Sequence, residues 1–348
     1  MSHKMSGKTW LSVVTLVLVV AIVYLARHEI VQAWRLLGQV NLWVLWLILP
    51  IQALSYYAAG AMIFSYLQAK DDIRLSGGEM AKMALELNFV NHILPSGGVS
   101  GASYMTWRLN HMGVSAGRAT LAQVVRLAMT FVAFLVLLIV AVLAITIDGN
   151  INRFTILVAS GLASTIIFGT IVIVYVIKNK TRLHRTGHWL VVIINRVWRH
   201  VSRREGRLLD ETRVITFLED LHDDYMTLSA SPRVLIRPFW WGIFFTFMEI
   251  AMFWVTFAAL GTPINPAPLL IAYGLAGFAG VFFPTPGGVG GYEAIMAGFL
   301  VTTGISQSAV IAAVLLTRTI LVIATIVTGY YFYQKALNKY GTHRTPRQ

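Results

Sequence analysis

Charged side chains lie within long apolar stretches of this sequence, and two of them are arginines that could hold an anion. Ionisable groups are costly at membrane depth, so each one is a candidate functional residue. Arg126 and Arg318 carry a guanidinium group, which binds phosphate oxygens in pairs and stays charged. If both reached one central cavity, they would suit a phosphate. The other ionisable residues at this depth are Glu79, Lys82, Glu86, His92, Arg108, Glu249 and Glu293.

The same arginines could instead have a structural role. Each could pair with a buried glutamate (Glu86, Glu249 or Glu293) and so lock two helices together. Both roles are compatible in one protein. The sequence therefore predicts substrate-binding roles for these two arginines and three glutamates, and it leaves the pairing among them open.

Two glycine-rich turns interrupt apolar stretches, one within residues 94–101 and one within 284–293. Glycine lets the chain reverse and lets backbone N–H groups approach a ligand, and the half-helix that follows presents its positive end. Such a turn would suit an anionic headgroup; close helix packing through small residues is the alternative. The candidate binding residues in the turns are Ser96, Gly97, Gly98, Thr285, Gly287 and Gly288.

Glu293 follows the second turn near the start of its half-helix, whereas the first turn has Ser103 at the matching position. The helix dipole favours a carboxylate there, but the same carboxylate would repel a phosphate. It could bind a cationic headgroup, exchange a proton or pair with an arginine. Asn91 and Tyr292 are further candidate binding residues, as neutral hydrogen-bonding groups beside the turns, with packing between helices as the alternative.

Enzymatic interpretations have less support in the sequence. The segment Gly101-Ala102-Ser103-Tyr104 is similar to the Gly-x-Ser element of intramembrane serine proteases, but such a serine needs a histidine base, and only His92 lies at a comparable depth. The sequence contains no His-Glu-x-x-His motif, no cluster with metal-ligand spacing and no phosphate-binding loop. We therefore expect no catalytic residue, no metal and no cofactor, with an intramembrane hydrolase as a remote alternative.

The composition is that of an integral membrane protein. Hydrophobic residues make up 57% of the chain, charged residues only 12%, and the mean hydropathy is +0.68, whereas soluble domains carry about 25% charged residues. The net charge of +13 has to be judged by position before it implies nucleic acid, and we expect no nucleic-acid partner. The absence of cysteine excludes disulfides and thiolate chemistry.

About six apolar stretches approach the ~20-residue length of a membrane span: 10–26, 42–67, 118–147, 155–177, 235–260 and 306–333. Two hairpins interrupted by Gly and Pro lie between them, at 79–112 and 268–304. Each arm is short enough to enter the membrane and return to the same side, which is tolerated only where protein or water covers the irregular backbone. The predicted fold is all-α and polytopic, with full spans plus two re-entrant broken-helix hairpins.

Charge predicts the orientation of these spans. If the N-terminus is cytoplasmic and each hairpin crosses an even number of times, the outer loops hold only Arg27, Arg35 and Arg153. The cytoplasmic side then receives most of the basic residues, including ten between Lys178 and Arg213. This asymmetry follows the positive-inside rule, so we expect both termini in the cytoplasm and a location in the cell inner (plasma) membrane.

The same orientation makes the two halves inverted copies. Gly97-Gly98-Val99 matches Gly287-Gly288-Val289, and Arg126 matches Arg318 with a slip of one or two residues. Inverted repeats with broken helices are a recurrent architecture of secondary transporters. We divide a single membrane domain, 1–348, into a first span (10–26), repeat 1 (42–147), a linking span (155–177), a cytoplasmic amphipathic connector (178–230), repeat 2 (235–333) and a cytoplasmic tail (334–348).

The segments 91–101 and 284–294 resemble the signatures of the lysylphosphatidylglycerol synthase transmembrane region, a flippase-like domain, and the resemblance covers essentially the whole chain. It implies a polytopic inner-membrane protein related to a lipid flippase. We expect a stand-alone member without the aminoacyltransferase domain of the bifunctional relatives. Many relatives carry a Gly-Glu pair in the first motif, whereas here Ala102 and Ser103 follow Gly101, so the lysyl-lipid substrate is not carried over.

Together these features predict a flippase or transporter that moves a phospholipid or lipid-linked precursor between leaflets. Membrane lipids with anionic headgroups are the expected partners, and a separate lipid-modifying enzyme is a further one. The alternative from a different class is a non-catalytic scaffold or accessory subunit of a lipid- or glycan-synthesis enzyme.

Overall fold

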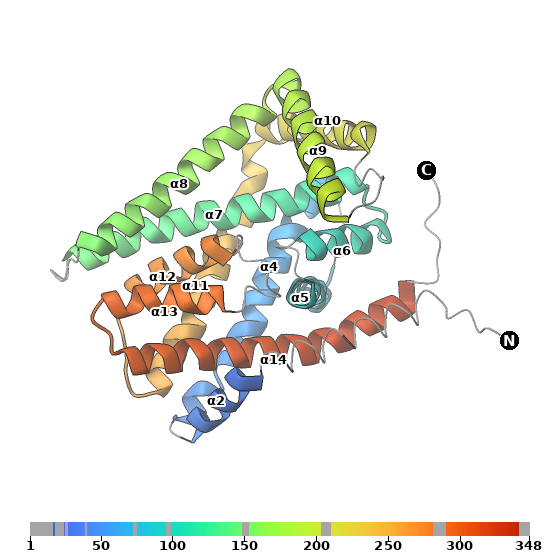
Figure 1. The fold of residues 1–348 in the computed structure, drawn as a ribbon. Coiled ribbons are helices and arrows are strands. Elements are labelled where there is room, and N and C mark those ends of the chain that lie inside the picture. The colour runs from blue at the N-terminus through green and yellow to red at the C-terminus, as the bar shows by residue number, and fades with distance from the viewer. Residues whose placement is uncertain are drawn as a thin grey trace.

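The fold is all-helical, as the sequence predicts. A computed structural model describes Val17, Tyr24 and residues 27–38, 40–71, 75–94, 99–147, 153–202, 210–280 and 290–340. These residues form α-helices, one short 3₁₀ helix and the turns between them, without a β-strand anywhere in the described part of the chain (Figure 1). Side chains of α8 (Arg153–Ile177) such as Phe168, Ile171 and Ile173 are exposed, as expected for a helix that contacts lipid.

Five helical segments among the described residues are long and apolar enough to cross a membrane: Leu42–Ala69, Ala116–Ile147, Arg153–Ile177, Pro232–Ala259 and Gln307–Tyr340. They comprise α3 (Leu42–Leu45) with α4 (Ile48–Asp71), then α7 (Ala116–Ile147), α8 (Arg153–Ile177), the 3₁₀ helix η1 (Pro232–Leu235) with α11 (Ile236–Ala259), and α14 (Gln307–Tyr340).

Each of these segments coincides with a predicted span to within a few residues, except at the C-terminal end of the last. The helix α14 continues to Tyr340, so the first residues of the predicted tail, 334–348, are helical, and the cytoplasmic location of this tail stays a prediction. The predicted first span, 10–26, lies outside the described residues apart from Val17 and Tyr24. The segment 27–37, expected to be a loop, is the helix α2 (Arg27–Leu37).

The two predicted hairpins are pairs of short helices. The first pair is α5 (Gly77–Ile93) and α6 (Val99–Asn110), and the second is α12 (Pro266–Gly280) and α13 (Gly291–Thr302). Figure 1 shows α5 end-on, whereas α12 and α13 run in the same general direction as α7 and α14. The two pairs are therefore oriented differently, and their entry from opposite sides of a membrane stays a prediction.

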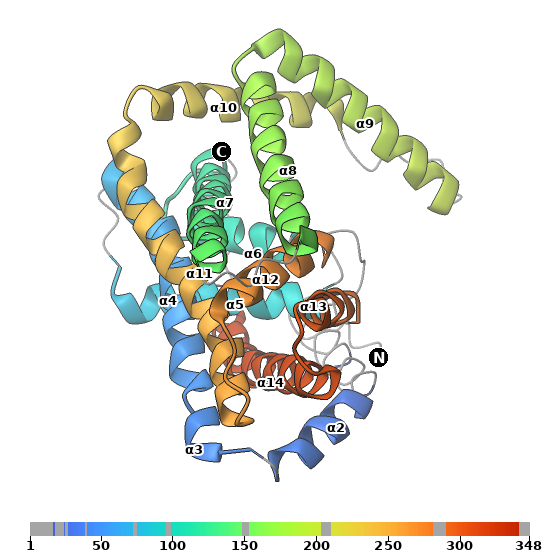
Figure 2. The ribbon, with the colours of Figure 1, turned by 90° about the vertical axis from the view of Figure 1, so that its left-hand side faces the viewer.

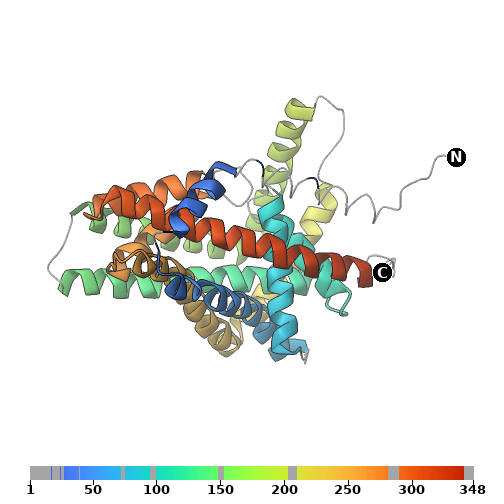
Figure 3. The ribbon, with the colours of Figure 1, turned by 90° about the horizontal axis from the view of Figure 1, so that it is seen from below.

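Packing between the two halves is reciprocal. The long helix α7 of the first half packs against α12 of the second, and α14 packs against α5, while α4 and α11 lie against each other. Figure 3 shows α5 crossing α14 at a steep angle. Each short-to-long helix junction turns at a glycine with positive φ, Gly113 at 84° before α7 and Gly304 at 89° before α14. Side chains other than glycine rarely adopt this conformation, which explains why glycine occurs in both halves.

The segment 178–230, predicted as an amphipathic connector, forms the helices α9 (Lys180–Ser202) and α10 (Glu211–Ser229). They lie at one end of α8 and α11, and α10 runs across the ends of those helices (Figure 2). The two halves of the protein are thus joined by α8 and by this helical pair. The buried charged residues described below lie in three separate places, around Arg318, around Glu86 and at Arg126.

Candidate functional site

The first charged cluster joins α13 to α14. Arg318 Nε lies 2.7 Å from Glu293 Oε1, and the guanidinium lies over the ring of Tyr292 at 4.4 Å from its centroid. The side chains of Arg318 and Glu293 are only 15% and 13% exposed. The other carboxylate oxygen of Glu293 accepts a hydrogen bond from the N–H of Gly290, at 2.7 Å, across the start of α13. Glu293 therefore caps its own helix and neutralises Arg318 at the same time.

A second carboxylate lies close to this ion pair. Glu249 of α11 accepts a hydrogen bond from the Ser55 hydroxyl of α4 at 2.5 Å and a longer one from the Tyr273 hydroxyl of α12 at 3.5 Å. It also lies within electrostatic reach of Arg318. Three of the predicted site residues, Arg318, Glu293 and Glu249, thus belong to one polar region, and Tyr292 interacts electrostatically with all three.

Neutral groups extend this region along α4 and α14. The side-chain amide nitrogen of Gln52 has two N–H groups and lies within hydrogen-bond distance, 3.0–3.1 Å, of three acceptors: the Tyr56 hydroxyl, the Leu321 carbonyl and the Thr325 hydroxyl. The hydroxyls of Tyr56 and Thr325 are 2.5 Å apart. This network satisfies a Gln side chain that is only 5% exposed, as a polar group within a span requires.

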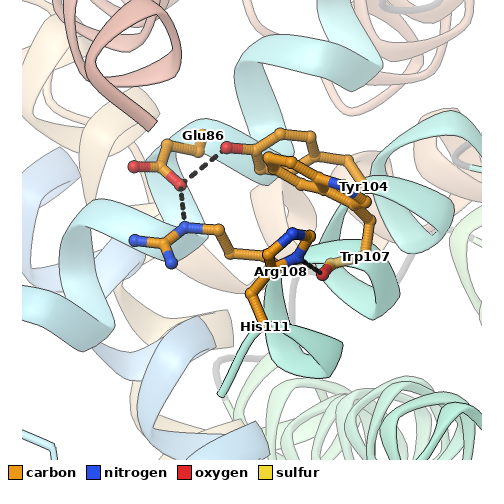
Figure 4. A network of polar contacts seen from close by, with 5 residues as sticks. All are labelled: Glu86, Tyr104, Trp107, Arg108 and His111. Atoms are coloured by element: carbon orange, nitrogen blue, oxygen red, sulfur yellow. Dashed lines mark hydrogen bonds and ion pairs between the residues drawn. The ribbon is translucent and has the colours of Figure 1, made fainter. Parts of the chain in front are cut away.

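The third predicted carboxylate, Glu86, belongs to a different cluster, within the first hairpin (Figure 4). It is 3% exposed. The Tyr104 hydroxyl donates to Glu86 Oε2 at 2.9 Å, and Arg108 Nε lies 3.4 Å from the same oxygen. The Arg108 guanidinium also lies 4.1 Å from the ring centroid of Tyr340, at the end of α14. Glu86 therefore ties α5 to α6, and Arg108 extends the link to α14.

Asn91 has a structural role at the first interruption. Its side-chain oxygen accepts a hydrogen bond from the N–H of Gly101 at 2.8 Å. A Cβ at position 101 would overlap the Asn91 amide, so the close approach of α5 to α6 requires glycine there. This contact connects the two arms on either side of the turn.

Arg126 lies apart from all three acidic residues. It sits on α7, is half-buried, and its Nε is buried without a hydrogen-bond partner among the described residues. One turn earlier, Gln123 is 6% exposed, and both polar atoms of its side chain are likewise buried without a described partner. The structure therefore does not bring Arg126 into the cluster of Arg318, Glu293 and Glu249. The helices that carry the two arginines, α7 and α14, both pack against α4 and α11, and the convergence of the arginines on one cavity stays a prediction.

The comparison with known families agrees with this architecture. Residues 10–329 match the family described as the lysylphosphatidylglycerol synthase TM region. The chain belongs to this family. A curated relative is the UPF0104 membrane protein of Methanothermobacter thermautotrophicus, which is 22% identical over 234 residues, or 66% of this chain and 67% of the relative. This family member is a multi-pass membrane protein, and its family membership implies a function related to membrane lipid.

Several predicted site residues of this family member lie outside the described residues, namely Ser96, Gly97, Gly98, Thr285, Gly287 and Gly288. The hydrolase alternative gains no support from the residues that are described. Ser103 is exposed on α6, and Nδ1 of His92 lies 2.8 Å from the Asn88 carbonyl of its own helix. Within the same part of the chain, no three His, Asp or Glu side chains are placed to hold a metal ion.

Sequence reasoning missed several polar partners. Ser55, Tyr273, Gln52 and Gln123 all lie in apolar segments and were not singled out. The two glutamines carried a usable signal, because an amide within a span must find a partner or a ligand. Ser55 and Tyr273 gave little signal in the sequence, because Ser and Tyr also occur in membrane spans without a functional role.

Proposed function

We propose that this protein moves a phospholipid, or a lipid-linked precursor that carries a phosphate, between the leaflets of the membrane. The family supports a role linked to membrane lipid. The observation that carries the proposal is Arg126, a half-buried guanidinium on a candidate span that lacks an acidic partner among the described residues.

A half-buried arginine without an acidic partner among the described residues, such as Arg126, is energetically costly. A charge left unpaired in a low-dielectric interior costs several kcal/mol (roughly 3–5 when a partner is removed). Polar groups at membrane depth are usually paired with each other or with a substrate. A phosphate would supply the missing negative charge to Arg126 and could accept a hydrogen bond from the neighbouring Gln123 amide. Both anionic and zwitterionic phospholipids carry that group, which is why the proposal names the phosphate rather than one headgroup.

The two other clusters have supporting roles in this proposal. Arg318, with its charge compensated by Glu293, joins α14 to α13 and lies within electrostatic reach of Glu249, which continues the polar region toward Ser55 in the first half. Glu86 and Asn91 hold the first interruption. The substrate would pass between these two points, with Glu293 selecting the headgroup when its pairing to Arg318 is released.

In this proposal the protein performs no covalent chemistry. Its partners are membrane lipids and, in the cell, a separate enzyme that modifies the lipid. We place it in the plasma membrane with both termini in the cytoplasm, on the strength of the distribution of basic residues.

The test uses purified protein in vesicles that contain a fluorescent phospholipid. Leaflet exchange is followed by reduction of the outer-leaflet probe with dithionite. Wild type should accelerate exchange over protein-free vesicles, and Arg126→Met should remove most of that acceleration. The matched control is Arg118→Met, which changes an exposed arginine two turns earlier on the same helix, and should leave exchange unchanged.

Two outcomes would count against the proposal. Exchange no faster than in protein-free vesicles, for anionic, zwitterionic and polyprenyl-phosphate probes alike, would favour the scaffold function. Full activity of Arg126→Met would remove Arg126 from the substrate path even if the protein transports lipid. Mass spectrometry of the lipids that co-purify with wild type and with Arg126→Met gives an independent measure of binding.

A further inference from the structure

The helix α9 extends away from the rest of the protein (Figure 2). Among the described helices, α10 and α8 are the ones that pack against it; any other described helix makes isolated contacts at most. Three side chains on one face pair with acids of α10: Lys180 with Asp223 at 2.9 Å, His184 with Glu219 at 2.8 Å and His188 with Glu211 at 2.6 Å. Hydrogen bonding to Asp223 raises the pKa of Lys180. These contacts fix which side of α9 faces the protein.

Large apolar side chains of α9 are exposed, namely Trp189, Leu190, Val192, Ile194 and Trp198. With about 3.6 residues per turn, Trp189 and Val192 lie opposite the side on which Gly187 packs against Leu218 of α10, whereas Ile194 lies close to that buried side. Soluble surfaces rarely expose several large apolar groups together. Because the described packing of α9 is with α10 and α8, the stripe formed by Trp189 and Val192 is free to contact another phase or another molecule.

Basic residues border this stripe. Arg185, Trp189 and Arg196 are separated by four and then seven residues, so they lie along one side of the helix. Both arginines are exposed, and the helix contains no Asp or Glu at all. An apolar stripe with Trp, bordered by arginine on a helix without acids, is typical of a helix that lies in the headgroup region of a membrane.

The position of α9 also favours a membrane surface. The candidate span α8 ends at Ile177, and α9 begins at Lys180, so its first turn lies where that span leaves the membrane. Arg182 fixes the junction: its guanidinium donates to the Tyr175 carbonyl at 2.9 Å and lies 3.7 Å from the Tyr175 ring centroid. The first turn therefore cannot move far from the end of α8.

We propose that α9 is a surface arm that inserts Trp189 and Val192 at the membrane interface and binds anionic phospholipid headgroups through Arg185 and Arg196. Basic residues near an anionic surface gain roughly fivefold in binding each, the equivalent of about 1 kcal/mol. This role is independent of lipid translocation, because it uses neither Arg126 nor the clusters of the spans. It would make the position of α10, and so the link between the two halves, depend on the lipid of one leaflet.

The test exploits the absence of cysteine from the chain. Single cysteines at Val192 and, as the matched control on the opposite side of the helix, at Ile194 are labelled with a fluorophore in the full-length protein; both side chains are 37% exposed. The protein is placed in nanodiscs of phosphatidylcholine, with or without phosphatidylglycerol. Quenching by nitroxide-bearing lipids and by aqueous iodide is compared for each label.

With phosphatidylglycerol, the label at 192 should be quenched by the lipid nitroxide and shielded several-fold from iodide, whereas the label at 194 should stay accessible to iodide. Arg185→Gln with Arg196→Gln should reduce the lipid quenching at 192 in anionic nanodiscs, by up to roughly 25-fold in the partition constant if each arginine contributes fivefold. It should change little in phosphatidylcholine alone.

Iodide access at 192 that is equal in anionic nanodiscs and in detergent would overturn the proposal. Energy transfer between donor and acceptor labels at 192 on different copies, with no lipid quenching, would show that a second copy covers the stripe and would also overturn it. Size-exclusion profiles identical to wild type establish that the arginine variants are folded, because neither residue has a described partner within the protein that their removal would leave unpaired.

Discussion

The ion pair between Arg318 and Glu293 gives the sharpest test of how charge is stabilised inside this protein. Both side chains are about 85% removed from solvent, and their closest atoms are 2.7 Å apart. Removing one partner of such a pair costs roughly 3–5 kcal/mol, because the other charge stays buried. Glu249 lies within electrostatic reach of Arg318 and compensates part of the lost charge. We therefore expect Glu293→Gln to lower the free energy of unfolding by about 3 kcal/mol, the low end of this range.

The substitution to glutamine is chosen because it separates charge from capping. The amide oxygen of Gln can still accept the hydrogen bond from the N–H of Gly290, so the start of α13 is retained. Arg318→Gln should cost a similar amount and also remove the contact with the Tyr292 ring, which is worth up to about 2 kcal/mol when desolvated. The double variant should cost clearly less than the sum of the two, because neither charge is then left alone.

The assay is the free energy of unfolding in mixed micelles, measured by titration with a denaturing detergent and followed by circular dichroism. The matched control is Asp223→Asn, which breaks the pair with Lys180. That pair has a similar distance, 2.9 Å, but its side chains are 53% and 66% exposed, so the free energy of unfolding should hardly change. If Glu293→Gln cost no more than Asp223→Asn, and the double variant were additive, the burial argument for this site would be wrong.

Further predictions concern the other clusters, with the same unfolding assay. Arg126→Met should be at least as stable as wild type, since it removes a charge without a described partner; a loss of several kcal/mol would reveal a partner within the protein. Gly101→Ala should cost about 1–3 kcal/mol, because its Cβ would overlap Asn91, whereas Gly161→Ala in open space on α8 should be neutral or stabilising by up to about 1 kcal/mol. Tyr104→Phe should cost about 1–3 kcal/mol through the lost hydrogen bond to buried Glu86, and Arg108→Met should cost more; the reverse order would contradict the assignment of Arg108 as the counter-charge.

The family relation can be recognised from the two Gly- and Pro-rich interruptions in the sequence. Most of the membrane segments can be recognised from the apolar stretches. A span needs only a sufficient length of apolar residues, which is a local property of the sequence, and a Gly- or Pro-rich break in such a stretch is equally visible. This is why the predicted segments at 118–147 and 155–177 coincide with Ala116–Ile147 and Arg153–Ile177. The glycines at 113 and 304 were part of the same local pattern.

The partners of the charged residues were decided by the tertiary structure. The sequence offered three glutamates for two arginines, and helix packing assigned Glu293 to Arg318, placed Glu249 beside Ser55, and gave Glu86 to Arg108, which left Arg126 without an acid among the described residues. Ser55 and Glu249 are 194 positions apart in the sequence, and they meet because α4 and α11 pack together. The rotation and tilt of each helix determine such contacts, and many distant side chains set them jointly, so no local pattern encodes them.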